Sequence, residues 1–408
     1  MSNPGLSWGR HLAHLRRPER RLRVLHACGG IATSRPTFRI INVATLDEIF
    51  ELDERYRTLL ESVFPDGTLH LGSREGDVVA VPLGSLVVPV DILLSGPPCP
   101  PWSAAGCRRG RNDARADVFT VVMRWTVHLI KAGGLLAVVI ENVPGINQDL
   151  QECSYFLARV IEALNIECPE FVWRFRTINT EEYAIPHHRE RVYLRGLRRI
   201  VAGGAMPASL PPFGNARLEE FLDMTVPNAK RDSLGGNRRV NLRHIEVRVR
   251  CLLARGAIKP GQIACVPIDR AVHKVYGCPI FLDRCPTLTT RNWYLFVFSV
   301  EDLDKVDRLR RLFRYLTPLE RLRLQGCPDS DRNSLSFVAA RHAAGNAFSS
   351  CAMAAQLGPL IDAMGGMPAG SLLAWPPPGL ASGVVGPSAM NFLSGDVGGS
   401  DRRVISRR

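Results

Sequence analysis

The amino-acid sequence predicts an α/β protein with a doubly wound sheet, because strand-like runs alternate with helical patterns through about residue 200. Two of these runs, residues 90–94 and 135–140, are rich in apolar residues, as strands buried on both faces are. Each run is followed by a turn with a reactive side chain, Cys99 after the first and Glu141 after the second. The carboxyl ends of parallel strands share the edge of a sheet where ligands bind, so we expect both side chains at one site.

The N-terminal part of the expected sheet begins with a strand at residues 23–27. This strand runs into a Cys-Gly-Gly loop at residues 28–30, where we expect the equivalent of the phosphate loop of a Rossmann-like half. Glu51 follows the next apolar run, and Asp77 comes after a further glycine. Acids at successive strand ends suit a nucleoside site, although each carboxylate alone is equally typical of an ordinary surface acid.

Cys99 lies in a proline-rich turn, residues 96–103, with the sequence GPPCPPWS. Prolines fix φ and keep the chain out of a helix, which predicts an ordered loop with a thiol able to act as a nucleophile. A cysteine between prolines is, by itself, more often part of a structural turn. The acid Glu141 at the same sheet edge favours the functional interpretation.

Five motifs follow one another along the chain. They are GPPC at 96–99, ENV at 141–143, RERV at 189–192, RYLTPLE at 314–320 with RLQGCPD at 323–329, and GNAF at 345–348. In these motifs and their order, the chain resembles the DNA (cytosine-5) methyltransferase family over roughly its first 355 residues. The resemblance implies a Rossmann-like S-adenosylmethionine-dependent methyltransferase sheet with a smaller target recognition domain.

The resemblance also implies catalytic roles in moving a methyl group to carbon 5 of cytosine in DNA. Carbon 5 is a poor nucleophile until a thiolate adds to carbon 6, and Cys99 would form this covalent adduct. Glu141 would act as the acid at N3 and Arg191 would stabilise charge near O2, while Arg189 would anchor the Cys99 loop. Without the other motifs, a solvated strand face would be the better interpretation of both arginines.

S-adenosylmethionine is the cofactor that the resemblance implies, and we expect no metal. The expected donor contacts are His26, Ala27, Gly29, Gly30, Glu51, Asp77, Val78, Pro98, Asn346 and Ala347. The family usually carries another glycine in its first loop, so Cys28 is expected to narrow the donor pocket. Eleven cysteines without a Cys-x-x-Cys pair predict free thiols in a reducing compartment, the nucleus of a eukaryote or the cytoplasm and nucleoid of a bacterium.

Double-stranded DNA is the expected partner, with the target base flipped into the pocket around Cys99. The expected nucleic-acid contacts are Ser103, Arg108, Arg109, Arg111, Thr289 and Arg291. The loop at 104–117 is rich in arginine and glycine, which suits phosphate contacts, although a plain surface loop is the alternative. A net charge of +13 and a pI near 9.6 favour a polyanionic partner. We expect a monomer and no membrane association, since no run of about eighteen apolar residues occurs.

Two rival functions stay open. One branch of the same family methylates tRNA, but its Cys-Phe-Thr signature does not occur in this sequence. The other rival is a catalytically silent nucleic-acid-binding protein, which the altered loop at residues 28–30 favours and which the intact Cys99 and Glu141 motifs oppose.

The expected organisation has five parts: a basic N-terminal arm at 1–20, a catalytic domain at 21–197, a target recognition domain at 198–290, a return at 291–364 that completes the catalytic domain, and a disordered tail at 365–408. We expect the arm to be disordered and to contact DNA, with an organelle transit peptide as the alternative. Residues 241–253 predict a helix with a basic face, either functional or merely solvated. Thr317 and Glu320 have capping-box spacing, and residues 348–364 predict a final helix that packs back onto the catalytic domain.

Overall fold

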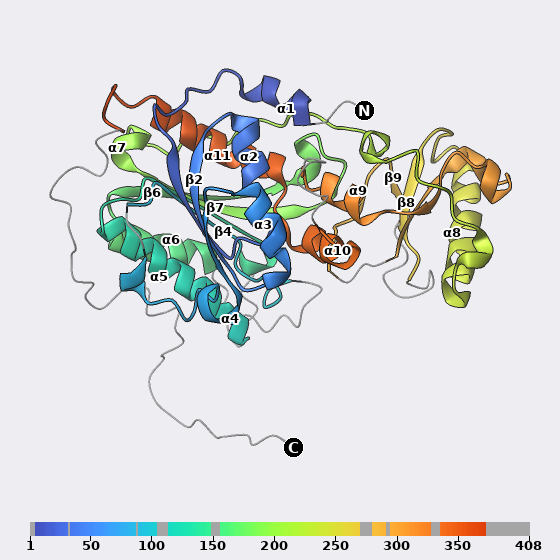
Figure 1. The fold of residues 1–408 in the computed structure, drawn as a ribbon. Helices are drawn as coiled ribbons and strands as arrows, with labels where there is room; N and C mark the ends of the chain where they lie inside the picture. The colour runs from blue at the N-terminus through green and yellow to red at the C-terminus, as the bar shows by residue number, and fades with distance from the viewer. Residues whose placement is uncertain are drawn as a thin grey trace, which may run out of the picture.

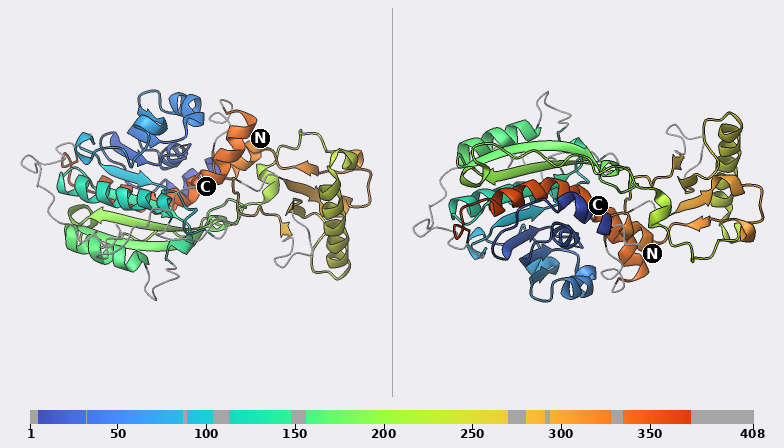
Figure 2. Two further views of the ribbon diagram at one scale, coloured as in Figure 1. Left: turned by 90° about the horizontal axis from the view of Figure 1, so that it is seen from below. Right: turned by 90° about the horizontal axis from the view of Figure 1, so that it is seen from above.

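The computed structural model describes residues 5–31, 33–86, 89–103, 113–147, 156–269, 280–290, 294–327 and 335–372. Figures 1 and 2 show a larger lobe built on one sheet and a smaller lobe built on another, with α9 (Pro318–Arg323) and α10 (Phe337–Asn346) between them. The expected tail lies outside the described residues from position 373 onward.

The larger lobe contains a seven-stranded sheet in the order β3-β2-β1-β4-β5-β7-β6. Its strands are β1 (Leu22–Ala27), β2 (Thr45–Glu51), β3 (Thr68–Leu71), β4 (Ile92–Ser95), β5 (Ala137–Asn142), β6 (Phe171–Asn179) and β7 (Glu190–Arg198). β1 to β5 run parallel to one another, whereas β7 runs antiparallel to both β5 and β6. The strand order reverses between β1 and β4, which is where open α/β sheets bind their ligands.

Helices cover both faces of this sheet, as expected for a doubly wound fold. Alternate residues of each strand enter different cores: Val24 and Leu94 pack with α2 (Ser34–Ile41), α3 (Arg57–Val63) and α11 (Ser350–Gly365). Leu25 and Leu93 pack on the other face with α5 (Asp117–Lys131) and α6 (Phe156–Glu167). Two shorter helices, α4 (Gly72–Glu75) and α7 (Arg199–Ala202), complete the lobe. None of the described helices is long and apolar enough to cross a membrane.

The expectation of a disordered N-terminal arm is wrong for residues 5–20. α1 (Gly5–Leu12) is a helix, and Trp8 and Leu12 are buried in the same core as α11. Arg16 forms an ion pair with Asp362 of α11 at 3.0 Å. Apolar side chains at helical spacing, together with this pairing, hold the segment against the predicted final helix, which the structure confirms as α11.

The smaller lobe contains a four-stranded antiparallel sheet in the order β11-β10-β8-β9. Its strands are β8 (Ile263–Pro267), β9 (Phe281–Leu282), β10 (Leu295–Ser299) and β11 (Phe313–Tyr315). The sheet therefore extends past residue 290, the boundary expected from the sequence, because β10 pairs with β8 across the intervening chain. Pairing between distant strands leaves no local signal of where a domain ends.

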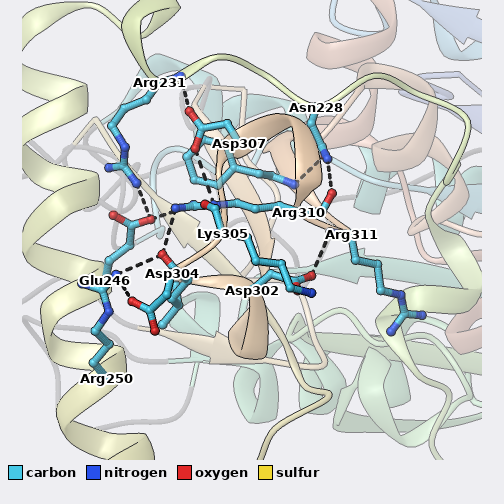
Figure 3. Close-up of polar contacts among 12 residues, drawn as sticks. Asn228, Arg231, Glu246, Arg250, Asp302, Asp304, Lys305, Asp307, Arg310 and Arg311 are labelled. Carbon is cyan, nitrogen blue, oxygen red and sulfur yellow. Dashed lines mark hydrogen bonds and ion pairs between the residues drawn. The ribbon is translucent and has the colours of Figure 1, made fainter.

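One long helix, α8 (Gly236–Ala254), covers the smaller sheet and contains the helix expected at 241–253. Leu242, Ile245 and Val249 are buried against the sheet, while Arg243 and Arg248 are exposed. Figure 3 shows that the helix is also held by charge: Arg231 and Arg310 both donate to Glu246 Oε1, at 2.7 and 2.9 Å. Arg310 belongs to the connection between β10 and β11, so this buried cluster fastens the helix to the sheet.

Candidate active site

The site is organised by the point where the strand order reverses. Ala27 at the end of β1 pairs with Ser95 at the end of β4, and the Ser95 hydroxyl donates to the Ala27 carbonyl at 2.7 Å. The loops that follow these two strands therefore begin side by side. One is the Cys-Gly-Gly loop at 28–30, and the other is the proline-rich turn that carries Cys99.

The turn around Cys99 is ordered and tethered. The backbone N–H groups of Trp102 and Ser103 donate to the Cys99 carbonyl at 3.0 and 2.9 Å, which closes the turn. Asn142 at the end of β5 donates from Nδ2 to the Pro97 carbonyl at 3.2 Å. Cys99 is half-buried and packs against the core on one side, so the turn holds it in one place.

Glu141 and two arginines stand beside this turn. Glu141, on β5, is only 7% exposed, and Arg191 Nε on the adjacent β7 lies 2.9 Å from Glu141 Oε1. Arg189 Nη2 lies 3.7 Å from the same oxygen. Although the ion pairs are close, Glu141 Oε1 accepts no hydrogen bond from any of the described residues. A buried carboxylate oxygen in this state can still exchange a proton or a hydrogen bond with a ligand.

The charges around Cys99 shift the pKa of its thiol in opposite directions. Burial raises the pKa of Cys99, Arg191 and Arg189 lower it, and Glu141 raises it, with burial the largest effect. Burial also lowers the pKa of Arg189 to about 10, so this guanidinium is still charged at neutral pH. Cys99 is therefore a thiol at rest, and its thiolate would be stabilised by the arginines once the proton leaves.

Arg189 does not anchor the Cys99 loop through any hydrogen bond between described residues, which corrects the sequence-based prediction. Its guanidinium donates instead to the carbonyls of Leu288, Gly345 and Ala347, at 3.4, 3.4 and 2.8 Å. The side chain is almost fully buried and points toward chain segments that are remote in sequence. It therefore joins the cluster around Glu141 to the segment at 345–348.

The segment at 345–348 packs tightly against the site. A Cβ atom on Gly345 would come within 2.4 Å of the Thr290 nitrogen, so the close approach requires glycine there. The Phe348 ring packs on Gly96, where an added Cβ would lie 2.5 Å from the ring. Asn346 is exposed at the end of α10. The last motif thus touches both the start of the nucleophile turn and the smaller-lobe segment near Thr289.

The loop after β1 forms an open cradle beside Glu51. Gly30 donates its backbone N–H to Glu51 Oε2 at 2.7 Å, and the Asp53 N–H donates to Oε1 at 2.8 Å. Gly30 has a φ of 58°, and a Cβ atom there would meet nothing within 4 Å. A carboxylate fixed at the end of β2, next to an unfilled glycine loop at the sheet's switch point, fits the ribose end of S-adenosylmethionine.

Cys28 adopts the left-handed backbone conformation, with a φ of 59°, that glycine usually occupies. The loop therefore keeps a glycine-like path although the glycine is missing. Among the expected donor residues, Val78 is buried, Asp77 and Pro98 are partly exposed, and the Asp77 carboxylate accepts the Val79 N–H at 3.0 Å.

His26 differs from the other expected donor residues, because its ring is a core contact. Nε2 lies 2.8 Å from Asp47 Oδ1, and the Ser34 hydroxyl lies 3.2 Å from Nδ1. The ring is also almost fully buried, so we correct the expectation that its side chain contacts the donor. Strand alternation explains the difference, since neighbouring residues of β1 point to opposite faces of the sheet.

The expected nucleic-acid contacts fall in two groups. Ser103 and Thr289 are described and partly exposed, Ser103 at the end of the Cys99 turn and Thr289 beside Gly345. Arg108, Arg109, Arg111 and Arg291 lie outside the described residues. Among the described residues, no group of three His, Cys, Asp or Glu side chains has the arrangement of a metal site.

Sequence reasoning missed three residues that the structure brings to the site. Asn142 stands next to Glu141 in its motif, and that position was the available signal. Tyr56 and His342 meet across a separation of 286 residues, with the hydroxyl 2.9 Å from Nδ1. No local pattern in the sequence indicates this contact.

Comparison with known proteins finds methyltransferases that are similar to parts of this chain. Residues 68–229 match the family described as C-5 cytosine-specific DNA methylase. Type II methyltransferase M.NgoBV of Neisseria gonorrhoeae is 26% identical over 194 residues, which cover 42% of this chain and 44% of that relative. M.MthTI of Methanothermobacter thermautotrophicus is 32% identical over 109 residues, covering 26% and 30%. The matched segments span less than half the length of these relatives.

Solved structures resemble the fold over most of the chain. The methyltransferase EhMeth of Entamoeba histolytica superposes with a TM-score of 0.53 at 16% identity, covering 84% of this chain and 98% of that one. The Dnmt2 methyltransferase of S. pombe gives 0.54 at 14% identity, with 84% and 98% covered. These likenesses confirm the fold expected from the sequence, a Rossmann-like α/β sheet with a smaller second lobe.

Proposed function

This chain resembles the DNA (cytosine-5) methyltransferases in sequence and fold, and from that resemblance we propose that it methylates carbon 5 of cytosine in double-stranded DNA. One observation carries the proposal. A half-buried thiol, Cys99, lies in a tethered turn beside Glu141 and Arg191, at the point where the sheet would also bind a nucleoside. S-adenosylmethionine, when bound, supplies an electrophilic methyl group.

Cys99, Glu141 and Arg191 each have a separate role in the proposed reaction. Cys99, after losing its proton to water, bonds through Sγ to carbon 6 of the base, and the electrons displaced from the ring move toward N3 and O2. Glu141 donates a proton at N3, and Arg191 stabilises the charge near O2. Carbon 5 is then nucleophilic and takes the methyl group. Water then takes the carbon-5 proton as Cys99 Sγ departs, which restores the ring, and N3 returns its proton to Glu141.

The base must leave the duplex to reach Cys99, so the proposal includes base flipping. The smaller lobe would then serve as the target recognition domain. Ser103, Thr289 and Arg291 would contact the DNA, and the arginines at 108, 109 and 111 would contact its phosphates.

The test is transfer of a labelled methyl group from S-adenosylmethionine to mixed-sequence duplex DNA, with tRNA as a parallel substrate. Cys99→Ala should abolish the labelling, whereas Cys251→Ala, on the exposed side of α8, is the matched control and should retain it. Substantial turnover by Cys99→Ala would contradict the mechanism. Labelling of tRNA alone would establish the RNA-directed enzyme instead.

A second candidate is a silent nucleic-acid-binding protein, which the left-handed Cys28 in the donor loop favours. Calorimetric titration with S-adenosylmethionine separates the two functions. Saturable donor binding supports the enzyme, and DNA binding without donor binding supports the silent protein.

A further inference from the structure

His187 is a fully buried histidine that lies two residues before Arg189 in the chain. Its Nδ1 lies 3.1 Å from the carbonyl oxygen of Leu324, which follows α9, and the Leu288 backbone N–H donates to its Nε2 at 2.9 Å. Leu288 belongs to the connection between β9 and β10 of the smaller lobe, and α9 lies between the lobes (Figures 1 and 2). One ring therefore joins three parts of the chain that are remote in sequence.

The two partners of His187 fix the proton on its ring. A carbonyl oxygen only accepts and a backbone N–H only donates, so Nδ1 carries the proton and Nε2 carries none. The ring is thus neutral. Burial lowers the pKa of His187 well below its ordinary value, and the positive charges of Arg189 and Arg191 lower it further. Both ring nitrogens are satisfied, so the side chain is a fixed bridge between Leu324 and Leu288.

The backbone around His187 pairs with the same part of the smaller lobe. The Cys285 N–H donates to the Pro186 carbonyl at 2.6 Å, and the His188 N–H donates to the Cys285 carbonyl at 2.8 Å. These bonds form a parallel bridge between His187 and Cys285. The Thr287 hydroxyl adds a third bond, to the His188 carbonyl at 2.7 Å. The segment at 285–288 therefore lies along the residues that lead into β7.

Leu288 is held through both of its backbone polar groups. Its N–H donates to His187, and its carbonyl accepts from Arg189 Nη1 at 3.4 Å. The same stretch of chain reaches the Glu141 cluster, since Arg189 Nη2 and Arg191 Nε lie 3.7 and 2.9 Å from Glu141 Oε1. One short segment thus contacts both Leu288 and Glu141, and it sets the separation between them.

The residues that follow Leu288 give this arrangement its functional meaning. Thr289 is partly exposed, and the proposed function assigns it a contact with DNA. Thr290 packs closely on α10, because a Cβ atom on Gly345 would come within 2.4 Å of the Thr290 nitrogen. With tight packing on one side and hydrogen bonds on the other, the position of Leu288 determines where Thr289 stands.

We propose that His187 is a positioning residue for the nucleic-acid substrate: its neutral ring holds Leu288, and through it Thr289, at a fixed place beside Glu141 and Arg191. The inference rests on the proposed function and deepens it, because it names the side chain that sets the DNA-contacting segment relative to the reacting groups. His187 itself needs no contact with DNA, since it acts through the backbone of Leu288.

His187→Leu tests the role, because leucine fills a similar volume and can neither donate nor accept a hydrogen bond. We expect the KM for duplex DNA in the labelled-transfer assay to rise about tenfold, since the DNA-contacting segment loses its fixed place. Cys99, Glu141 and Arg191 are unchanged, so kcat at saturating DNA should stay within about twofold of the wild type.

His187→Gln is the conservative variant. The glutamine amide has a donor nitrogen and an acceptor oxygen separated by one carbon, as Nδ1 and Nε2 are, so it can bond both Leu324 and Leu288. We expect its KM for DNA to stay within about threefold of the wild type. Hydrogen exchange, followed by mass spectrometry of peptides that contain Leu288, measures the bond directly. Exchange should be faster in His187→Leu than in the wild type and slow again in His187→Gln.

A second variant covers the case in which His187→Leu does not fold. In His187→Asn the shorter amide can still donate to Leu324 but does not reach Leu288, so we expect a raised KM for DNA here too. Thermal unfolding of each variant gives the temperature range in which all of them are folded and can be compared.

Gln356→Leu is the matched control for the loss of a buried polar side chain. Gln356 is fully buried on α11, and its Oε1 accepts from the Ser209 hydroxyl at 2.7 Å, so its hydrogen bond joins other parts of the chain. The control should shift the unfolding midpoint at most and keep the wild-type KM for DNA.

The outcomes separate this inference from the proposed function. A wild-type KM for DNA in the folded leucine or asparagine variant, an equal rise in Gln356→Leu, or no recovery in His187→Gln overturns the positioning role and leaves the enzyme intact. A wild-type protein that transfers no methyl group to DNA overturns the proposed function itself, and the positioning role with it.

Discussion

Two buried glutamates, each set between two arginines, allow the two lobes to be compared directly. In the smaller lobe, Glu246 is 3% exposed and its Oε1 accepts hydrogen bonds from Arg231 and Arg310 (Figure 3). In the larger lobe, Glu141 is 7% exposed and lies 2.9 Å from Arg191 Nε and 3.7 Å from Arg189 Nη2. Residue types, burial and charge are nearly the same at both places.

The two clusters differ in whether their hydrogen bonds are complete. Arg310 also donates to the carbonyls of Lys305 and Leu303, and the cluster continues through Asp307 to the backbone of Arg231. By contrast, Glu141 Oε1 and Arg189 Nε are buried without a hydrogen-bond partner among the described residues. The Glu246 cluster is thus fully hydrogen-bonded, as a structural cluster is, whereas the two unpaired atoms of the Glu141 cluster lie beside Cys99 and are able to hydrogen-bond a ligand.

The largest expected effect is on chemistry at the Glu141 cluster. Glu141→Gln keeps the shape of the side chain but an amide does not give up a proton, so we expect the methyl-transfer rate to fall by about 10²–10⁴-fold. Labelled transfer at saturating DNA and donor measures it. DNA binding should weaken far less than the rate, and an equal loss of both would contradict the acid role.

The matching substitution in the smaller lobe should affect stability instead. Glu246→Gln leaves the buried Arg310 without its main counter-charge, which we expect to lower the free energy of unfolding by about 3–5 kcal/mol. Urea denaturation measures this, with Glu141→Gln as the paired control. If Glu246→Gln unfolded at the wild-type midpoint, the distinction between the two clusters would fail.

The third prediction concerns Cys99. This thiol lies beside the Glu141 cluster, and no residue of the Glu246 cluster corresponds to it. Because burial raises the pKa of Cys99, its thiolate fraction should rise about tenfold per pH unit from pH 7 to 9. Alkylation of Cys99 by iodoacetamide, followed by mass spectrometry, should accelerate by the same factor. Arg191→Met removes a charge that lowers this pKa, so the variant should react more slowly at each pH. A rate that is flat from pH 7 to 8 would argue against the buried thiol.

The smallest expected effects come from an asparagine beside each glutamate cluster. Asn142 donates to the Pro97 carbonyl, and Asn228 Oδ1 accepts the Phe313 N–H at 2.7 Å. Each Asn→Ala change should cost about 1 kcal/mol. In Asn142→Ala we expect the lost hydrogen bond to slow methyl transfer severalfold. In Asn228→Ala we expect it to lower the midpoint of urea unfolding. Slower methyl transfer by a fully folded Asn228→Ala variant would contradict this prediction.

Much of the larger lobe is predictable because its strands are short apolar runs followed by informative turns. The runs ending before Cys99 and Glu141 are strands β4 and β5, and the last helix and the cap at Thr317 are where the sequence places them. The smaller lobe is less predictable, because its sheet is assembled from strands separated by up to several tens of residues. The sequence predicts a disordered N-terminal arm because the segment is rich in arginine. Trp8 and Leu12 nevertheless form a buried face there, and the prediction is wrong for this reason.

By itself, the sequence determined the α/β class, because local patterns of apolar runs and turns encode it, and the motif order, whose resemblance to a known family predicts that Cys99, Glu141 and Arg191 share one site. Only the tertiary structure decided which of two similar glutamate clusters is incompletely hydrogen-bonded, that Arg189 holds the segment at 345–347, and that Tyr56 meets His342. These features depend on distances between atoms from remote parts of the chain. Hydrogen bonding is satisfied or left open only after those parts have packed together.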